Sequence, residues 1–161
     1  MREERVESVE FATNRFGRIS VPCGSIYRFP GLPGFADARE FAILEHAENS
    51  IFGWLVSLED PDLAFVMSSP WHFFPDYQPG LSRDDLTSVG VERAEDLEVM
   101  CLVTVCDGRI HLNLAAPLLL NVSARRGRQI ILQGDAYPTR APVPDPPPET
   151  APGGEGGRTG D

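Results

Sequence analysis

Adjacent carboxylates are the feature of this sequence that most resembles catalytic machinery. They occur in three places, at Glu59-Asp60 with Asp62 close behind, at Asp84-Asp85 and at Glu95-Asp96. General acid–base catalysis needs two carboxylates in different environments that face one pocket. These pairs are neighbours in sequence and lie in segments typical of turns or of a helix start, where both side chains are solvated. They therefore predict acidic surface rather than an active site.

Other catalytic and metal-binding patterns are absent from the sequence. It contains no GxSxG, no HExxH and no glycine-rich phosphate loop, and all 14 basic residues are arginine. Three cysteines form no CxxC pair, and His46, His72 and His111 are far apart. The sequence shows no nucleophile–base constellation of the kind that a hydrolase needs. We expect no enzyme, no metal and no cofactor, and a ligand- or metal-binding small β-barrel remains the alternative.

An aromatic segment, SPWHFFPDY at residues 69–77, is the densest cluster of large side chains. Its two prolines, Pro70 and Pro75, predict that it forms neither a helix nor a long strand. Such a cluster either plugs one end of the core or offers contact surface, for which Trp and Tyr are favoured. We expect both roles. If the segment is extended, its side chains alternate in direction, with Trp71 and Phe73 on one side and His72 and Phe74 on the other.

The net charge of −10 comes from the middle of the chain. Residues 36–108 hold 15 acidic residues against 3 arginines, whereas residues 109–140 hold 1 acidic residue against 5 arginines. This balance argues against direct binding of nucleic acid, whose phosphates would be repelled. The acidic middle is either a solvated face or a surface that steers toward a basic partner. Arg125, Arg126 and Arg128 form a small basic patch, either solvated or facing acidic groups of a partner or of the protein itself.

Short segments rich in Val, Ile, Leu and Phe, separated by Gly, Pro, Asn and Asp, predict many short strands. Asp107-Gly108 between two of them favours a type I′ hairpin turn. That turn predicts two cross-strand pairs, Cys106 with Arg109 and Thr104 with His111.

A second, longer hairpin is indicated by Arg126-Gly127. Helical signal is confined to LSRDDLTSVGV at residues 81–91, where Ser82 is a candidate N-cap. The pattern predicts an all-β protein, a small antiparallel barrel-like or sandwich fold with one or two short helices.

The composition changes near residue 141. Residues 141–161 contain six prolines and five glycines and no large side chain beyond Val143, which predicts a disordered tail. We expect one β domain at 1–140 and this tail at 141–161. The charged start of the chain does not resemble a secretory signal, and no apolar run is long enough for a bilayer. The unpaired cysteines favour a reducing cytoplasm.

Four segments, in collinear order, resemble one known family. They are FPGLPGF at 29–35, LEDPDLAFVMSSPWHFFPDY at 58–77, LSRDDL at 81–86 and NLAAPLLLNVSARRGRQIIL at 113–132. Together they resemble the flagellar assembly factor FliW, and the resemblance extends over about residues 5–143. It implies a small β-barrel-like domain without enzymatic activity that works in bacterial flagellum biogenesis.

The resemblance also implies two protein partners. One is CsrA, a small basic dimer that represses translation by binding mRNA leaders, and the other is flagellin, held as by a chaperone before export. Binding of CsrA would relieve repression of flagellin mRNA, and accumulated flagellin would occupy the factor and free CsrA. We expect a cytoplasmic monomer that contacts neither nucleic acid nor membrane. The expected partner-binding residues are Glu59, Asp60, Asp62, Trp71, Phe73, Phe74, Asp76 and Tyr77, and the expected structural loop contains Pro30, Gly31, Pro33 and Gly34.

Overall fold

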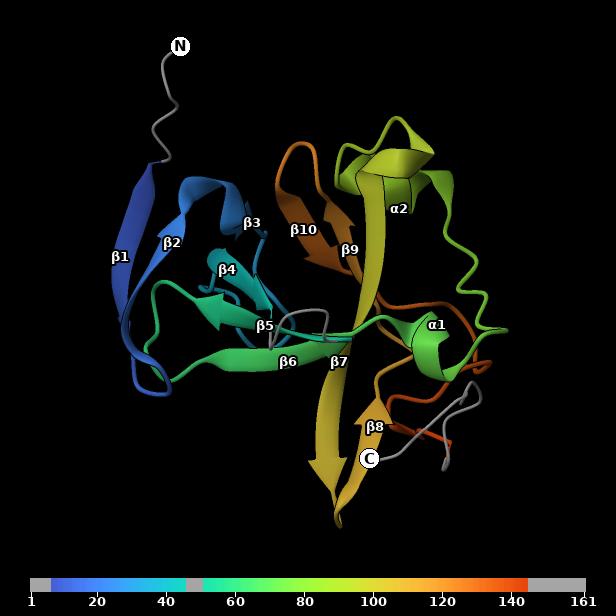
Figure 1. Cartoon of the computed structure of the whole chain (residues 1–161). Helices are drawn as coiled ribbons and strands as arrows, with labels where there is room; N and C mark the ends of the chain where they lie inside the picture. Colours follow the sequence, from blue (N-terminus) through green and yellow to red (C-terminus); the bar gives the residue numbers. More distant parts are fainter. Residues whose placement is uncertain (1–6, 46–50, 145–161) are drawn as a thin grey trace, which may run out of the picture.

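A barrel of seven strands forms the body of the protein, whose computed structural model describes residues 7–45 and 51–144 (Figure 1). β7 pairs with both β6 and β9, which closes the ring. In ring order the strands are β3 (Ile26–Arg28), β4 (Glu40–Glu45), β5 (Phe52–Ser57), β6 (Ala64–Ser68), β7 (Leu97–Cys106), β9 (Leu118–Asn121) and β10 (Arg126–Gln129).

The predicted all-β barrel is confirmed, with one exception to its antiparallel pairing. β3 and β10 run parallel and meet through a single residue pair, Arg28 with Arg126. A parallel contact between segments so distant in sequence cannot be predicted from turn signals, which report only on neighbouring strands.

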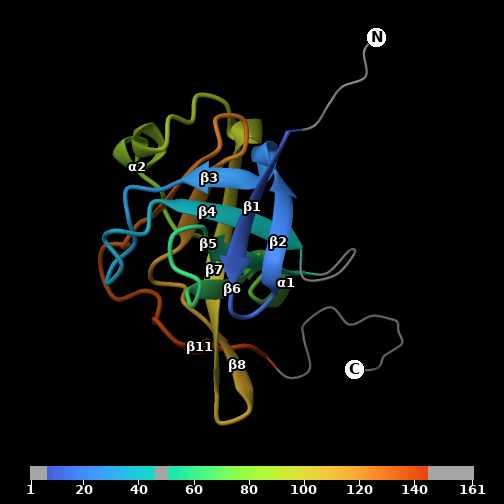
Figure 2. The ribbon, with the colours of Figure 1, turned by 90° about the vertical axis from the view of Figure 1, so that its left-hand side faces the viewer.

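Four further strands lie outside the ring. The β1–β2 hairpin packs on the outer face of β4 and β5 (Figure 2), and β8 and β11 extend the sheet beyond β7. These elements are β1 (Ser8–Thr13), β2 (Gly17–Pro22), β8 (Arg109–Leu112) and β11 (Ala141–Pro142), and two 3₁₀ turns occupy Cys23–Ser25 and Ala94–Asp96.

The core follows from the two-residue period of the strands. Side chains of one parity point into the barrel, among them Phe41, Leu55, Met67, Leu118 and Leu120. On β4 and β5 the other parity is also buried, because the β1–β2 hairpin covers it. These two strands are therefore apolar on both faces, which explains why their sequences do not alternate.

The two predicted hairpins are present. Cys106 pairs with Arg109 and Thr104 with His111, and Asp107 and Gly108 have φ of 55° and 74°, as a type I′ turn requires. The turn of the β9–β10 hairpin lies just before the Arg126-Gly127 pair from which the hairpin was predicted. Residues 122–125 form the turn, and Arg126 already pairs with Asn121.

Of the two predictions about helices, one is confirmed and one is wrong. α2 (Arg83–Ser88) is confirmed, and Ser82 and Asp85 close a reciprocal capping box at its start. The aromatic segment was wrongly predicted to be non-helical, since Pro70 to Phe73 form α1 (Pro70–Phe73). Pro70 occupies the first helical position, where a missing N–H costs nothing because that donor has no intrahelical acceptor.

The folded part runs past the expected boundary at residue 140. Ala141 is buried and pairs with Leu112, and the Val143 N–H donates to the Ile110 carbonyl at 3.0 Å. The disordered tail stays a prediction, because residues 145–161 lie outside the described residues. His46 lies outside them too.

Candidate functional site

The turn between β5 and β6 carries three of the predicted partner-binding residues, Glu59, Asp60 and Asp62. Ser57 is fully buried, and its hydroxyl accepts hydrogen bonds from the N–H groups of Glu59 and Asp60 at 3.1 and 3.0 Å. The Asp60 carboxylate accepts from the N–H of Asp62 at 3.0 Å. Such side-chain-to-backbone bonds fix a turn without regular structure. All three carboxylates are exposed on a fixed backbone.

This turn is tied to its surroundings on two sides. Glu59 Oε1 accepts hydrogen bonds from the N–H groups of Arg39 and Glu40, both at 3.3 Å, which joins it to the start of β4. On the other side, the Asn14 N–H donates to the Pro61 carbonyl at 2.8 Å, and the Asn14 amide donates to Asp62. The carboxylates are thus held between the β1–β2 turn and the segment before β4.

Two exposed aromatic rings flank the carboxylates. Phe35 is 42% exposed and lines a hollow with Glu59 and Asp60, whereas Phe16 is 37% exposed and lines another with Asp62. Both rings are supported edge-on from below, Phe35 by Phe65 and Phe16 by Trp54, with ring centroids 5.6 and 5.1 Å apart. We name the set Phe16, Phe35, Glu59, Asp60 and Asp62 the acidic surface.

Sequence reasoning missed the two rings of the acidic surface. The signals were nonetheless present, since Phe16 is a large apolar residue in a hairpin turn and Phe35 ends the FPGLPGF motif. Gly31 and Gly34 in that motif have φ of 105° and 85°, and a Cβ on Gly31 would lie 2.7 Å from the Ala36 carbonyl oxygen. Only glycine fits such a position. The loop thereby presents Phe35 beside the acidic turn.

The aromatic segment forms a cap on the far side of the barrel. Phe73 and Tyr77 are only 5% and 3% exposed and pack in one cluster with Cys101 and Leu112. Trp71 is 39% exposed, and Asp76 and His72 are also exposed. The cap therefore combines a buried plug with an exposed edge, but the direction of its side chains follows a helical turn rather than the expected alternation.

Hydrogen bonds hold the cap in place. The Tyr77 hydroxyl donates to the Leu114 carbonyl at 2.7 Å, and the indole N–H of Trp71 donates to the Tyr77 carbonyl at 2.8 Å. Burial raises the pKa of Tyr77 well above its ordinary value, and it raises the pKa of the Cys101 thiol to about 12. Both groups are neutral at physiological pH, so neither is an activated nucleophile.

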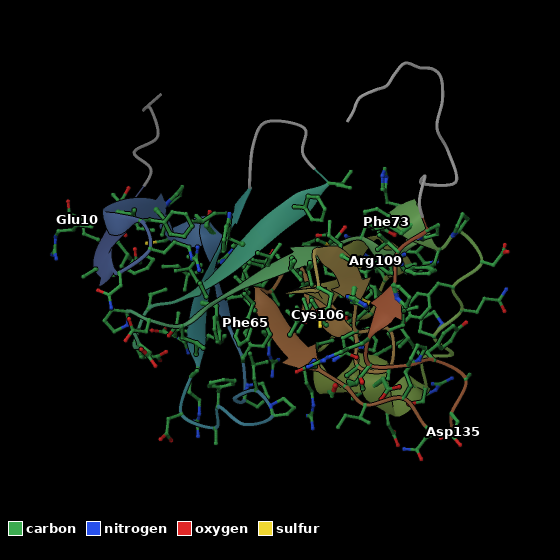
Figure 3. The ribbon with its side chains drawn as sticks, turned by 90° about the horizontal axis from the view of Figure 1, so that it is seen from below. Glu10, Phe65, Phe73, Cys106, Arg109 and Asp135 are labelled. Atoms are coloured by element: carbon green, nitrogen blue, oxygen red, sulfur yellow. The ribbon has the colours of Figure 1, made fainter. Side chains whose placement is uncertain are left out.

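The structure does not bring the predicted partner-binding residues together. The three acidic-turn carboxylates precede β6, and Trp71, Phe73, Phe74, Asp76 and Tyr77 follow it. A five-residue strand spans roughly 17 Å, so the two groups lie at opposite ends of the barrel wall. In Figure 3, Phe65 near the start of β6 and Phe73 in α1, beyond the end of that strand, lie apart. They form two surfaces rather than one.

Within residues 7–45 and 51–144, no group of three or more His, Cys, Asp and Glu side chains is placed to hold a metal ion. None of the helices in this described part is long and apolar enough to cross a membrane. The space that a ligand-binding barrel would keep open is filled here by side chains such as Tyr27, Phe29 and Phe41.

Comparison with known proteins bears on what these surfaces are for. The FliW protein family model matches residues 10–143. Flagellar assembly factor FliW 2 of Desulfotalea psychrophila is 38% identical over 132 residues, covering 81% of this chain and 87% of that protein. The flagellar assembly factor FliW of Magnetococcus marinus is 34% identical over 143 residues, with coverage of 87% and 85%.

A solved structure agrees with these sequence matches. The crystal structure of a flagellar assembly factor FliW superposes with a TM-score of 0.77 at 31% identity, covering 85% of this chain and 99% of that one. The overall fold is thus shared, and residues 10–143, which the family model matches, include both the acidic surface and the aromatic cap. This chain belongs to the FliW family.

Proposed function

We propose that this protein regulates flagellum assembly in the cytoplasm by binding CsrA through the acidic surface and thereby relieving CsrA's repression of flagellin mRNA. Family membership supports the role in flagellum assembly, and the relatives described above are named flagellar assembly factors. The binding of CsrA, and the binding of flagellin as its alternative partner, are the finer parts of the proposal.

The observation that carries the proposal is the acidic surface itself. Its three carboxylates belong to the strongly acidic middle of the chain and are exposed on a turn whose backbone is hydrogen-bonded on both sides. A partner that binds RNA must present positive charge, to which this surface is complementary. Carboxylates brought beside such a surface would repel phosphate and weaken RNA binding without filling the RNA site.

The fixed geometry of the acidic surface favours recognition of a protein. A turn held by Ser57, Asn14 and the start of β4 loses little conformational entropy when a partner binds. The exposed rings of Phe16 and Phe35 offer apolar anchors beside the charges, and aromatic side chains are enriched in interfaces. Charge then provides fast association, and the rings provide contact area.

Flagellin binding is proposed for the exposed edge of the aromatic cap. The terminal segments of flagellin are amphipathic helices when ordered, and such helices dock on apolar surface. Trp71 offers that surface beside His72 and Asp76, while Phe73 and Tyr77 support it from the core. Accumulated flagellin would occupy the protein and release CsrA, and export of flagellin would reverse the switch.

Calorimetric titration with CsrA and flagellin from the same organism tests the proposal. We expect CsrA to bind at micromolar concentration or tighter, and we expect this binding to disappear when the protein is first saturated with flagellin. Absence of CsrA binding in both titrations would overturn the proposal and leave at most a flagellin chaperone. CsrA binding that persists beside flagellin would refute mutual exclusion and show that the two surfaces bind their partners independently.

A further inference from the structure

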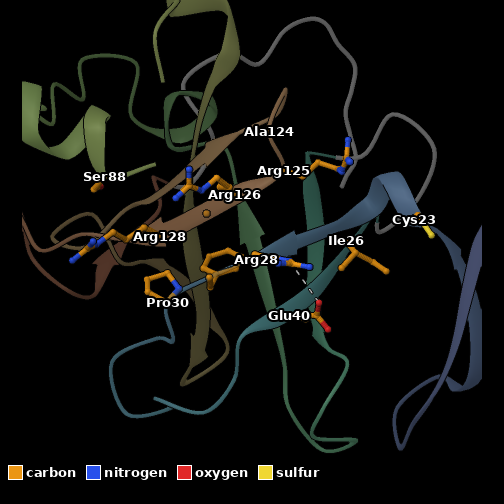
Figure 4. Close-up of a pocket in the computed structure, with 12 residues that line it drawn as sticks. Cys23, Ile26, Arg28, Pro30, Glu40, Ser88, Ala124, Arg125, Arg126 and Arg128 are labelled. Carbon is orange, nitrogen blue, oxygen red and sulfur yellow. Dashed lines mark ion pairs between the residues drawn. The ribbon is translucent and has the colours of Figure 1, made fainter. Parts of the chain in front are cut away.

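A groove rich in arginine lies on the outer face of the barrel, where β3 meets β10 (Figure 4). It has a volume of about 880 Å³ and is lined by two charged elements, β3 with Arg28 and the β9–β10 hairpin with Arg125, Arg126 and Arg128. We name these four residues and the space between them the arginine groove. It shares no residue with the acidic surface or with the cap.

The strand geometry explains why the arginines gather there. Gly127 faces inward, where a Cβ would lie only 2.4 Å from Cζ of Phe29, so Arg126 and Arg128 on either side of it face outward. Arg125 precedes them in the turn with φ of 57°. The single parallel pair between β3 and β10 brings Arg28 beside Arg126, although 98 positions separate them in the sequence.

The charge of the arginine groove is mostly uncompensated. Arg28 has a partner in Glu40, 3.8 Å away on the neighbouring strand β4 (Figure 4). Among the residues that the structure describes, no carboxylate lies within ion-pair distance of Arg125, Arg126 or Arg128. Three exposed guanidinium groups thus remain available on a protein whose net charge is −10. A concave site with this charge attracts carboxylates.

We propose that the arginine groove binds an acidic, extended peptide segment of a partner protein. The groove also has apolar lining, from Ile26, Pro30 and Ala124. An extended peptide presents alternate side chains to opposite sides, so it could direct carboxylates to the guanidinium groups and apolar groups to the floor. Arginine binds carboxylates in a planar, two-pronged geometry that suits such a ligand.

A nucleic acid strand fits the same charges less well. It carries a phosphate at every nucleotide, so a strand longer than the groove would extend over a protein whose net charge of −10 repels phosphate. A peptide of a few carboxylates matches the extent of the groove. The proposal is independent of CsrA binding, because a basic partner would be repelled here. It adds a third interaction surface, opposite in charge to the acidic surface.

The test uses the full-length protein and a dye-labelled peptide of about ten residues that alternates glutamate with valine. Fluorescence anisotropy measures its dissociation constant against the wild type and two double variants. The first, Arg125→Asn with Arg128→Gln, removes two groove charges, and asparagine tolerates the positive φ of position 125. The matched control, Arg109→Gln with Arg140→Gln, removes the same charge at exposed positions elsewhere.

We expect the groove variant to bind the peptide about tenfold more weakly than wild type and the control variant to change affinity less than about twofold. A peptide with glutamine in place of glutamate should bind none of the three proteins. Equal loss in both variants would overturn the proposal, because net charge alone would then explain binding. Tighter binding of an oligothymidine of similar length would also overturn it, in favour of nucleic acid. Self-association in sedimentation that only the groove variant abolishes would assign the groove to a second copy of the chain instead.

Discussion

The indole N–H of Trp71 donates a hydrogen bond to the carbonyl of Tyr77 across 2.8 Å, and the two rings lie 5.7 Å apart. This bond closes the aromatic segment on itself, with α1 at one end and Tyr77 at the other. Tyr77 in turn is anchored to Leu114 through its hydroxyl. The aromatic segment is therefore a folded cap with one exposed edge, rather than a loop of independent aromatic contacts.

Replacing Tyr77 with phenylalanine should destabilise the protein. The change keeps the ring but leaves the buried Leu114 carbonyl without the donor 2.7 Å away, which costs about 1–2 kcal/mol of unfolding free energy. Urea unfolding measures this cost. Tyr137→Phe is the control, because its hydroxyl bonds to Gln78 at an exposed site and its loss should cost less. Equal costs would show that the Leu114 bond does not anchor the cap.

The protein should lose stability in alkaline solution from about pH 9. Burial raises the pKa of Cys101 from its ordinary 9.0 to about 12, so the unfolded chain releases this proton first. The stabilisation is fully present below pH 9 and is lost as the pH rises toward 12. Tyr77, whose pKa is also raised from 10.0, adds a further loss above pH 10.

Urea midpoints at successive pH values test this alkaline dependence. In Cys101→Ala the fall in unfolding free energy should begin one pH unit later, near the ordinary pKa of 10.0 for tyrosine. Cys23 is exposed, so Cys23→Ala should leave the profile of the wild type unchanged. A wild-type midpoint that stays constant between pH 8.5 and 11 would contradict the burial of the neutral thiol.

Removing the charges of the acidic surface should slow association with CsrA. The triple variant Glu59→Gln, Asp60→Asn, Asp62→Asn keeps an acceptor oxygen at each position and so preserves the hydrogen bonds that shape the turn. We expect the association rate constant at low salt to fall about tenfold. Stopped-flow fluorescence provides this measurement.

A matched control separates local from overall charge. The variant Asp84→Asn, Glu92→Gln, Asp107→Asn removes three exposed carboxylates elsewhere in the acidic middle, and it should slow association much less. The wild-type rate should also fall as salt rises from about 0.05 to 0.5 M, since the Debye length shortens from more than about 10 Å to roughly 4 Å. A rate that does not depend on salt would reduce the acidic middle to a solvated face.

The features predicted correctly from the sequence are local ones. The Asp107-Gly108 turn sets its own register because few residue pairs adopt two positive φ angles, and Ser82 and Asp85 start α2 through bonds within one turn. α1 was missed although it is equally local. Proline is compatible with both a loop and the first position of a helix, so Pro70 does not distinguish them.

The candidate surfaces were predicted only in part, because they are assembled from distant segments. The carboxylates of the β5–β6 turn could be named from their sequence, but their neighbours Phe16 and Phe35 come from a different hairpin and a different loop. The patch of Arg125, Arg126 and Arg128 was likewise visible in the sequence. Its extension by Arg28 depends on the parallel β3–β10 contact, which no short-range signal encodes.

Adding a single methyl group at Gly127 should strain the contact between β10 and the barrel core. A Cβ there would lie 2.4 Å from Cζ of Phe29, so Gly127→Ala must displace either the ring or the strand. Overpacking of this kind costs about 1–3 kcal/mol of unfolding free energy. Gly24→Ala is the matched control, because nothing lies within 4 Å of its added Cβ, and it should be nearly neutral.

A double-mutant cycle identifies the cause of that strain. Phe29→Leu alone should destabilise the protein, since Phe29 is buried and its ring packs edge-on against Phe41. Combined with Gly127→Ala, the smaller side chain should make room for the new methyl group. The double variant should therefore lose about 1 kcal/mol less unfolding free energy than the sum of the two single losses. Urea unfolding of the four proteins gives the coupling. Full additivity would mean that Phe29 is not the obstacle, and the glycine would then be required for the backbone of β10 itself.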